Sequence, residues 1–176
     1  NIFMGDLVIL INTGLLTPHT ATETNNIGVF AGVSYTAELM HLRVLDGRCG
    51  GSTYDVAQGV LYAIGAENDS GEVPERPADI VNMSLGGGGY DPFFESVLQD
   101  ADERGVIVAV SSGNDGASSV SYPARYATTI AVGSVGFDGE VTSYSNRGEN
   151  LDLVAPGGGN GGGILSLHKS EEGFTY

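Results

Sequence analysis

Residues 78–115 read ADIVNMSLGGGGYDPFFESVLQDADERGVIVAVSSGND, and this stretch decides the fold. Two apolar runs, residues 79–83 and 106–110, flank an amphipathic segment in which apolar side chains recur at helical spacing. The second run is rich in β-branched residues, which suits a strand that is buried on both faces. Asp91 can cap the helix, and Gly105 follows its end. A strand, a helix and a strand in this order predict a parallel crossover unit.

The segments after these two strands contain mostly small side chains. They consist of Ser84, Leu85 and Gly86 after the first strand, and of Ser111, Ser112, Gly113 and Asn114 after the second. Ligands of open parallel sheets bind at the carboxyl ends of the strands. Small side chains there leave room for the backbone of a substrate, so this edge of the sheet is the candidate binding site.

The rest of the chain adds strands on both sides of this unit and a second helix. Apolar runs predict strands at residues 7–11, 38–45, 129–133 and 151–154. A helix begins at Ser52 or Thr53, because either side chain can cap it ahead of an apolar stripe. The turn signal at residues 136–139 predicts that residues 140–145 begin a hairpin.

Several motifs resemble those of the subtilisin-like serine proteases, or subtilases, and they occur in that family's order. They are VNMSLGG (81–87) with VIVAVSSGND (106–115), VSYPARYATTIAVGSV (120–135), YSNRG (144–148) and LDLVAPGG (151–158). The resemblance covers roughly residues 6–166. It implies an α/β fold, a doubly wound and mostly parallel sheet with helices on both faces, here incomplete, as a single domain over residues 1–176.

The resemblance also implies hydrolysis of peptide bonds by a Ser-His-Asp triad, but the triad positions are altered in this sequence. Asn12 stands where the family has Asp, and in a serine protease triad that exchange costs about 10⁴ in rate. The block with the family's histidine motif looks excised. His19 is the histidine near the gap; it could replace the catalytic base, but the favoured interpretation is that it belongs to the loop before the deletion. The family's serine motif would follow Tyr176, so we expect an internally deleted and truncated domain that is inactive or very weak as a peptidase.

Asn114 matches the family's oxyanion-hole amide, a donor whose removal in subtilases costs about 10²–10³ in kcat. By the same resemblance, one segment pairs with an extended substrate and another forms a wall of the specificity pocket. The pairing segment is Ser84, Leu85 and Gly86, and the wall is Ser111, Ser112 and Gly113. The resemblance therefore implies that the chain retains the walls of a peptide cleft and one oxyanion donor.

The resemblance implies a calcium site. It would use the side-chain oxygen of Asn26 and the carbonyls of Thr24, Ile27 and Val29, since calcium prefers oxygen ligands. The alternative for this segment is an ordinary turn. The resemblance also implies a weaker cation site, formed by the carbonyls around Ala124, Tyr126 and Thr129.

Composition restricts the partners of the chain. A formal charge of −15, with 22 acidic and 7 basic residues, argues against nucleic acid and anionic membranes as partners. Cys49 is the one cysteine, so it has no internal disulfide partner, and a surface thiol is the favoured interpretation. The family implies a secreted protein. The missing helices would leave apolar surface exposed, which predicts self-association into a dimer or larger assembly.

Two other functions stay open at this point. The chain could be a peptide-binding or interaction module that retains the cleft without the chemistry. It could also be a hydrolase acting on a small ester at a rebuilt site, with Asn114, a serine and either His19 or His168. His168 lies close to Ser166 and Ser170 in the sequence, whereas His41 falls inside a predicted strand and is interpreted as a sheet-face residue.

Overall fold

The computed structural model describes residues 7–12, 37–46, 50–159, 162–164, 168–170 and 173–175. Its elements, in chain order, are β1 (Leu7–Asn12), β2 (Glu38–Arg43), α1 (Thr53–Ala63), β3 (Ile80–Met83), α2 (Pro92–Glu103), β4 (Ile107–Ser111), β5 (Ile130–Val135), β6 (Leu153–Pro156), β7 (His168–Ser170) and β8 (Gly173–Thr175). The predicted strand–helix–strand unit is therefore β3, α2 and β4. Predicted and observed boundaries differ by no more than two residues at each end of these elements.

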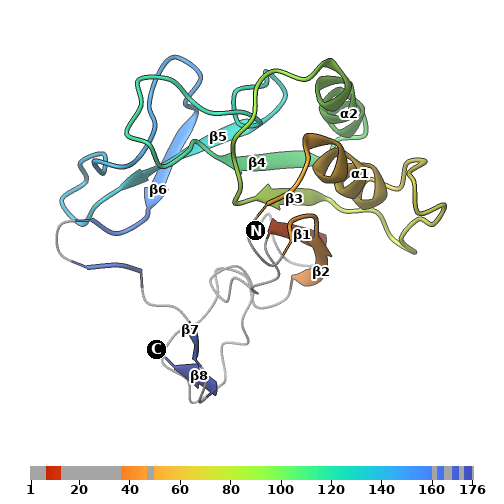
Figure 1. The fold of residues 1–176 in the computed structure, drawn as a ribbon, viewed down its shortest axis with the longest axis horizontal. Helices are drawn as coiled ribbons and strands as arrows, with labels where there is room; N and C mark the ends of the chain where they lie inside the picture. Colours follow the sequence, from red (N-terminus) through yellow and green to blue (C-terminus); the bar gives the residue numbers. More distant parts are fainter. Residues whose placement is uncertain are drawn as a thin grey trace.

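A six-stranded sheet runs through the molecule in the order β2-β1-β3-β4-β5-β6 (Figure 1). All five neighbouring pairs are parallel. A parallel sheet combined with helices confirms the predicted α/β fold. The strand order reverses beside β1, which lies between β2 and β3, and such reversals are where open parallel sheets bind ligands. Ile11 pairs with Met83, the last residue of β3, and Asn12 ends β1 in register with Arg43 of β2, so Asn12 and Ser84 lie at the same edge of the sheet.

Both helices begin at side-chain caps that the sequence predicts. The hydroxyl of Ser52 accepts a hydrogen bond from the backbone N–H of Asp55 at 3.0 Å, ahead of α1. The carboxylate of Asp91 accepts from the N–H groups of Phe93 and Phe94 at 2.9 and 3.1 Å, ahead of α2. These acceptors satisfy N–H groups that the first turn of a helix leaves without partners.

The hydrophobic core lies between the two helices and one face of the sheet. Val60 and Leu98, on α1 and α2, are fully buried, as are Val81 on β3 and Val108 on β4. The two helices contact each other, so both cover the same face. On β4 the alternate residue Ile107 is 43% exposed, so the expectation that this strand is buried on both faces is wrong for the described structure. Among the described residues, α1 and α2 are the only helices, so within this part of the chain helices cover one face of the sheet.

The hairpin predicted to begin at residue 140 is present but short. Val135 and Val141 form an antiparallel bridge, and the N–H groups of Gly136 and Thr142 donate to the carbonyls of Glu140 and Ser134 at 2.9 and 3.0 Å. The backbone then turns, since the N–H of Ser145 bonds to the carbonyl of Thr142 at 3.1 Å, and the segment folds back toward the sheet. His41 lies on β2 and is exposed, as its position in a predicted strand indicated. Within the described residues, none of the helices is both long and apolar enough to cross a membrane.

Candidate functional site

An open cavity of about 340 Å³ lies at the carboxyl ends of β3 and β4. Its lining includes Ser84, Ser111, Ser112, Gly113 and Asn114, which the sequence analysis selected as site residues. Residues from β5, from β6 and from the segment before β6 complete the lining. The topology brings these residues together because parallel neighbouring strands end at the same edge of the sheet.

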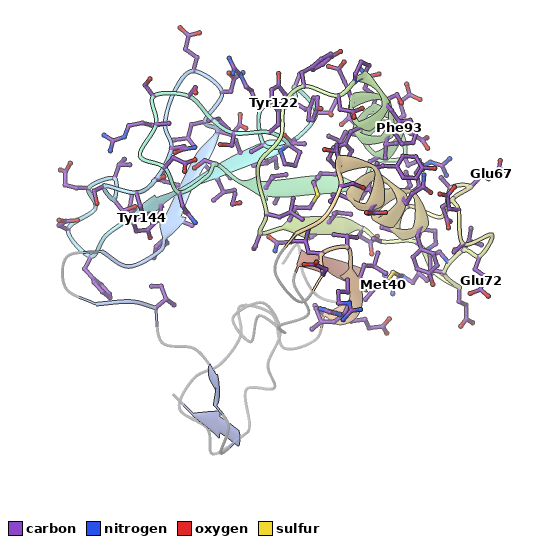
Figure 2. All side chains as sticks on the ribbon, in the orientation of Figure 1. Met40, Glu67, Glu72, Phe93, Tyr122 and Tyr144 are labelled. Atoms are coloured by element: carbon purple, nitrogen blue, oxygen red, sulfur yellow. The ribbon has the colours of Figure 1, made fainter. Side chains whose placement is uncertain are left out.

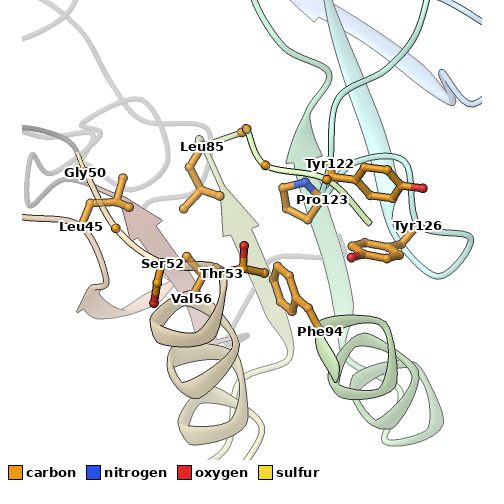
Figure 3. A pocket seen from close by; sticks show the side chains of 15 residues that line it. Leu45, Gly50, Ser52, Thr53, Val56, Leu85, Phe94, Tyr122, Pro123 and Tyr126 are labelled. Atoms are coloured by element: carbon orange, nitrogen blue, oxygen red, sulfur yellow. The ribbon is translucent and has the colours of Figure 1, made fainter. Parts of the chain in front are cut away.

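A second cavity, a groove of about 250 Å³, contains the other two predicted cleft residues, Leu85 and Gly86. Figure 3 shows Leu85 on one side of this groove, with Val56 from α1 and Phe94 from α2 below it. The hydroxyl of Ser111 donates to the carbonyl of Leu85 at 3.2 Å, which ties the two cavities to a common wall. The segment from Ser84 to Gly86 therefore separates two neighbouring hollows, as a strand that contacts an extended ligand would.

Asn114 lies in the turn that follows β4. The preceding Gly113 has a φ of +109°, a conformation that residues with a side chain rarely adopt. Asn114 is exposed and lines the first cavity, and its amide makes no hydrogen bond to any described residue. Its two N–H groups are therefore available to a ligand in the cavity.

Asn146 is a residue of this site to which the sequence analysis assigned no role. It is 1% exposed and lies behind the turn that carries Asn114. Its side-chain oxygen accepts hydrogen bonds from the N–H groups of Asp115 and Ala117 at 3.0 and 2.9 Å. Its position within the motif YSNRG (144–148) was the available signal, since a polar residue with no chemical role in a shared motif is often structural.

Tyrosine side chains border both cavities. In the first cavity, the hydroxyl of Tyr144 lies 2.6 Å from the hydroxyl of Ser134 and donates to the carbonyl of Gly157 at 2.9 Å, next to β6 (Figure 2). In the groove, the hydroxyl of Tyr126 donates to the carbonyl of Asp91 at 3.0 Å and accepts from the N–H of Asp91 at 2.8 Å. Burial of Tyr126 raises the pKa of its phenol above the ordinary value of 10.0.

A side chain lies at the position of the weaker cation site. The hydroxyl of Thr129 lies among the carbonyls that would hold the ion, 3.0 Å from that of Ala124 and 2.9 Å from that of Tyr126. Thr129 is 7% exposed, so its hydroxyl proton already satisfies one of these carbonyls from inside the protein. Among the residues described, no three or more His, Cys, Asp or Glu side chains are grouped so that they could hold a metal ion.

Several predicted site residues cannot be placed. His19, Cys49 and the calcium segment with Thr24, Asn26, Ile27 and Val29 lie outside the described residues. Asn12 is described as the last residue of β1, and His168 as the first residue of β7, in both cases by their backbone alone. The predicted triad position at Asn12 is thus at the edge of the sheet where the cavity residues lie.

Comparisons with known proteins agree on one family. The sequence model of the subtilase family matches residues 15–175. The extracellular protease of Xanthomonas campestris pv. campestris is 40% identical over 139 residues, which is 78% of this chain and 24% of that protein. Subtilisin Savinase from Lederbergia lenta is 39% identical over 156 residues, covering 89% of this chain and 51% of the relative.

The solved structures give the same result. A protease from Pseudoalteromonas arctica superposes with a TM-score of 0.82 and 36% identity, over 90% of this chain and 49% of that one. The chain therefore spans about half the length, or less, of these similar proteins.

Proposed function

Because the chain belongs to the subtilase family, we propose that it provides the substrate cleft and an oxyanion donor of a subtilisin-like serine endopeptidase. The observation that carries this proposal is the unpaired amide of Asn114 at a cavity walled by Ser84 and Ser111. An amide without an internal partner is free to donate a hydrogen bond to a ligand. Its place at the carboxyl edge of a parallel sheet is where such ligands bind.

The cleft would hold a peptide in an extended conformation. The backbone from Ser84 to Gly86 would pair with the peptide in the manner of an added strand, and one apolar side chain would enter the cavity beside Gly113. The Asn114 amide would then donate to the peptide carbonyl as that oxygen becomes negative. Such a donor acts at about 2.7–3.1 Å and stabilises the transition state more than the bound substrate.

These 176 residues would hydrolyse peptides very slowly or not at all, because they contain neither the family's serine motif nor an Asp at position 12. Asn12 would hold a catalytic histidine without offering it a negative charge. Binding and the oxyanion donor alone leave a residual rate of roughly 10³–10⁴ over water in proteases of this kind.

The experiment combines a chemical probe with a binding assay on the same chain. A serine-directed fluorophosphonate should leave the chain unlabelled, and stoichiometric labelling would show that it is an active serine hydrolase. Titration with acetyl-Ala-Ala-Ala-Phe-amide, followed by calorimetry, should show saturable binding that weakens in Asn114→Ala. The absence of saturable binding would overturn the proposed cleft. Phe137→Ala is the matched control, because Phe137 is 75% exposed and lines neither cavity.

The two alternative functions are not favoured. A peptide-binding module would use the same cleft, so it differs from the proposal only in that it would not hydrolyse the bound peptide. An esterase would need a histidine beside a serine, and the side chains of His19 and His168 lie outside the described residues.

We propose a secreted location, because one similar protein is an extracellular protease by name.

Calcium bound by the segment around Asn26 is a further proposal. A melting temperature that rises with added calcium and falls with chelator would support it. Self-association is proposed from Leu153 and Val154, which are 56% and 49% exposed on the edge strand β6. A monomer by light scattering at micromolar concentration would refute that assembly.

A further inference from the structure

We propose that Asn146 is a positioning residue, which fixes the turn after β4 and thereby sets the direction in which the Asn114 amide donates. This inference rests on the proposed function, since the aim of Asn114 matters only if that amide binds a substrate oxygen. It adds to that function a residue that lies behind the cavity and does not line it.

The first argument is where the contacts of Asn146 fall in the sequence. Its side-chain oxygen accepts from the N–H of Asp115, the residue directly after Asn114, and from the N–H of Ala117. Its backbone N–H donates to the carbonyl of Gly113, the residue directly before Asn114, at 3.0 Å. One residue therefore holds the backbone on both sides of the oxyanion donor.

The second argument is that the Asn146 amide is itself held in one orientation. The N–H groups of Asp115 and Ala117 can only donate, so they require the oxygen end of the amide, and the nitrogen end then donates to the hydroxyl of Ser121 at 2.9 Å. The backbone carbonyl of Asn146 accepts from the hydroxyl of Ser112, itself 2% exposed, at 3.1 Å. Buried polar groups that are hydrogen-bonded in this way are costly to rearrange, so they hold one geometry.

The third argument is that Asn114 has no other support. Its amide makes no hydrogen bond to the described residues, so the conformation of the backbone decides where it lies. Donors that accelerate a reaction must be held in place before negative charge develops on the substrate oxygen. A side chain on a mobile turn would not be held in place. A rigid turn with an unbonded amide at its tip gives a donor that is both held in position and available to a substrate oxygen.

The contribution of the Asn146 side chain can be separated from that of the backbone, because backbone hydrogen bonds also join the two segments. The N–H of Gly116 donates to the carbonyl of Tyr144 at 2.7 Å, and that of Arg147 to the carbonyl of Ala117 at 3.0 Å. These bonds do not involve the side chain at position 146, so they remain when it is replaced. Variants at this position therefore test the side chain and not the pairing of the two segments.

The experiment compares amide hydrogen exchange and peptide binding by nuclear magnetic resonance in the ¹⁵N-labelled chain. Asn146→Leu retains the branching of the side chain but removes both acceptor and donor, whereas Asn146→Asp retains the acceptor for Asp115 and Ala117. We expect exchange at these two N–H groups to rise roughly tenfold or more in the leucine variant and to change little in the aspartate variant. Asp91→Ala, which removes a distant helix cap, is the control for a general loss of stability.

The second readout is the resonance of the Asn114 amide on addition of acetyl-Ala-Ala-Ala-Phe-amide. It should shift in the native chain, in Asn146→Asp and in Asp91→Ala, and should shift much less in Asn146→Leu. Native-like exchange at Asp115 and Ala117 in the leucine variant overturns the inference. If that variant does not fold, Ser121→Ala replaces it, because it removes only the hydrogen bond of the Asn146 amide nitrogen. The inference then requires faster exchange at the N–H groups of Asp115 and Ala117.

A native chain in which the peptide shifts no resonance overturns the proposed function. The hydrogen-exchange measurement would still test whether Asn146 fixes the turn, so a failure of the proposed function can be distinguished from a failure of the inference about Asn146.

Discussion

Replacing Gly113 by alanine should destabilise the protein by considerably more than its backbone conformation alone requires. A Cβ atom at this position would lie 2.8 Å from the hydroxyl oxygen of Ser121 and in direct conflict with the amide nitrogen of Asn146. Real Cβ atoms essentially never approach other atoms so closely. The turn would have to move away from Asn146, and Asn114 would move with it.

The size of the effect follows from two contributions. A φ of +109° costs an L-residue about 1–3 kcal/mol. Overpacking against buried neighbours adds about 1–3 kcal/mol, and restriction of the unfolded chain returns about 0.4–1 kcal/mol. We therefore expect a loss of about 2–5 kcal/mol, a large part of the roughly 5–15 kcal/mol that stabilises a typical domain.

Urea denaturation of two glycine variants tests this estimate. Gly105 has a similar conformation, with a φ of +77°, but a Cβ there meets no atom within 4 Å. Gly105→Ala should therefore lose only about 0.6–2 kcal/mol, which is the backbone contribution of about 1–3 kcal/mol less the return of about 0.4–1 kcal/mol from the unfolded chain. In a double-mutant cycle, Asn146→Ala should relieve part of the loss at Gly113, since the two residues are in contact. Equal losses for the two glycine variants, or strict additivity in the cycle, would refute the steric reasoning.

Three further predictions concern the scaffold. Asp91→Ala should lower the free energy of unfolding by about 0.5–2 kcal/mol, because α2 loses two hydrogen bonds at its N-terminus, and an unchanged thermal melt would contradict the cap. Leu98→Ala should cost about 2–5 kcal/mol in urea, since Leu98 is fully buried, whereas Phe137→Ala, at a side chain that is 75% exposed, should cost under about 0.5 kcal/mol. The raised pKa of Tyr126 stabilises the fold fully below pH 10.0, the ordinary value, and this contribution disappears as the pH rises through the folded-state pKa. The stability difference between the native chain and Tyr126→Phe should therefore shrink from pH 7 to pH 11, and a constant difference would contradict it.

Local sequence signals predicted the centre of the fold because several of them agreed. The capping residues at Ser52 and Asp91, the helical stripes and the β-branched run before Ser111 all indicate the same elements, and the structure has those elements. The start of the hairpin after residue 139 was predictable from its turn signal, but its length was not. A single turn does not determine how far pairing continues, and here it ends after Thr142, whose carbonyl accepts from the N–H of Ser145.

The site could be predicted in part, and the division has a physical reason. Residues at the carboxyl ends of β3 and β4 are close in space because parallel strands end at one edge, and this follows from topology alone. Asn146 lies more than thirty residues beyond Ser112, which donates a hydrogen bond to its carbonyl, and no periodicity connects the two segments. Only the path of the chain after β5 brings them together, so a sequence pattern could identify the motif but not its partner.

Because the donor and the residue that positions it are different residues, substitutions at the two positions should affect stability and peptide binding differently. The Asn114 amide has no hydrogen-bond partner among the described residues, so a substitution there should leave stability nearly unchanged while it weakens peptide binding. Asn146 is 1% exposed and paired on every side, so a substitution there should lower both. A plot of binding against stability for variants of the two residues should therefore give two distinct trends. A common trend would mean that the cleft responds only to overall stability, and that neither residue has the specific part assigned to it.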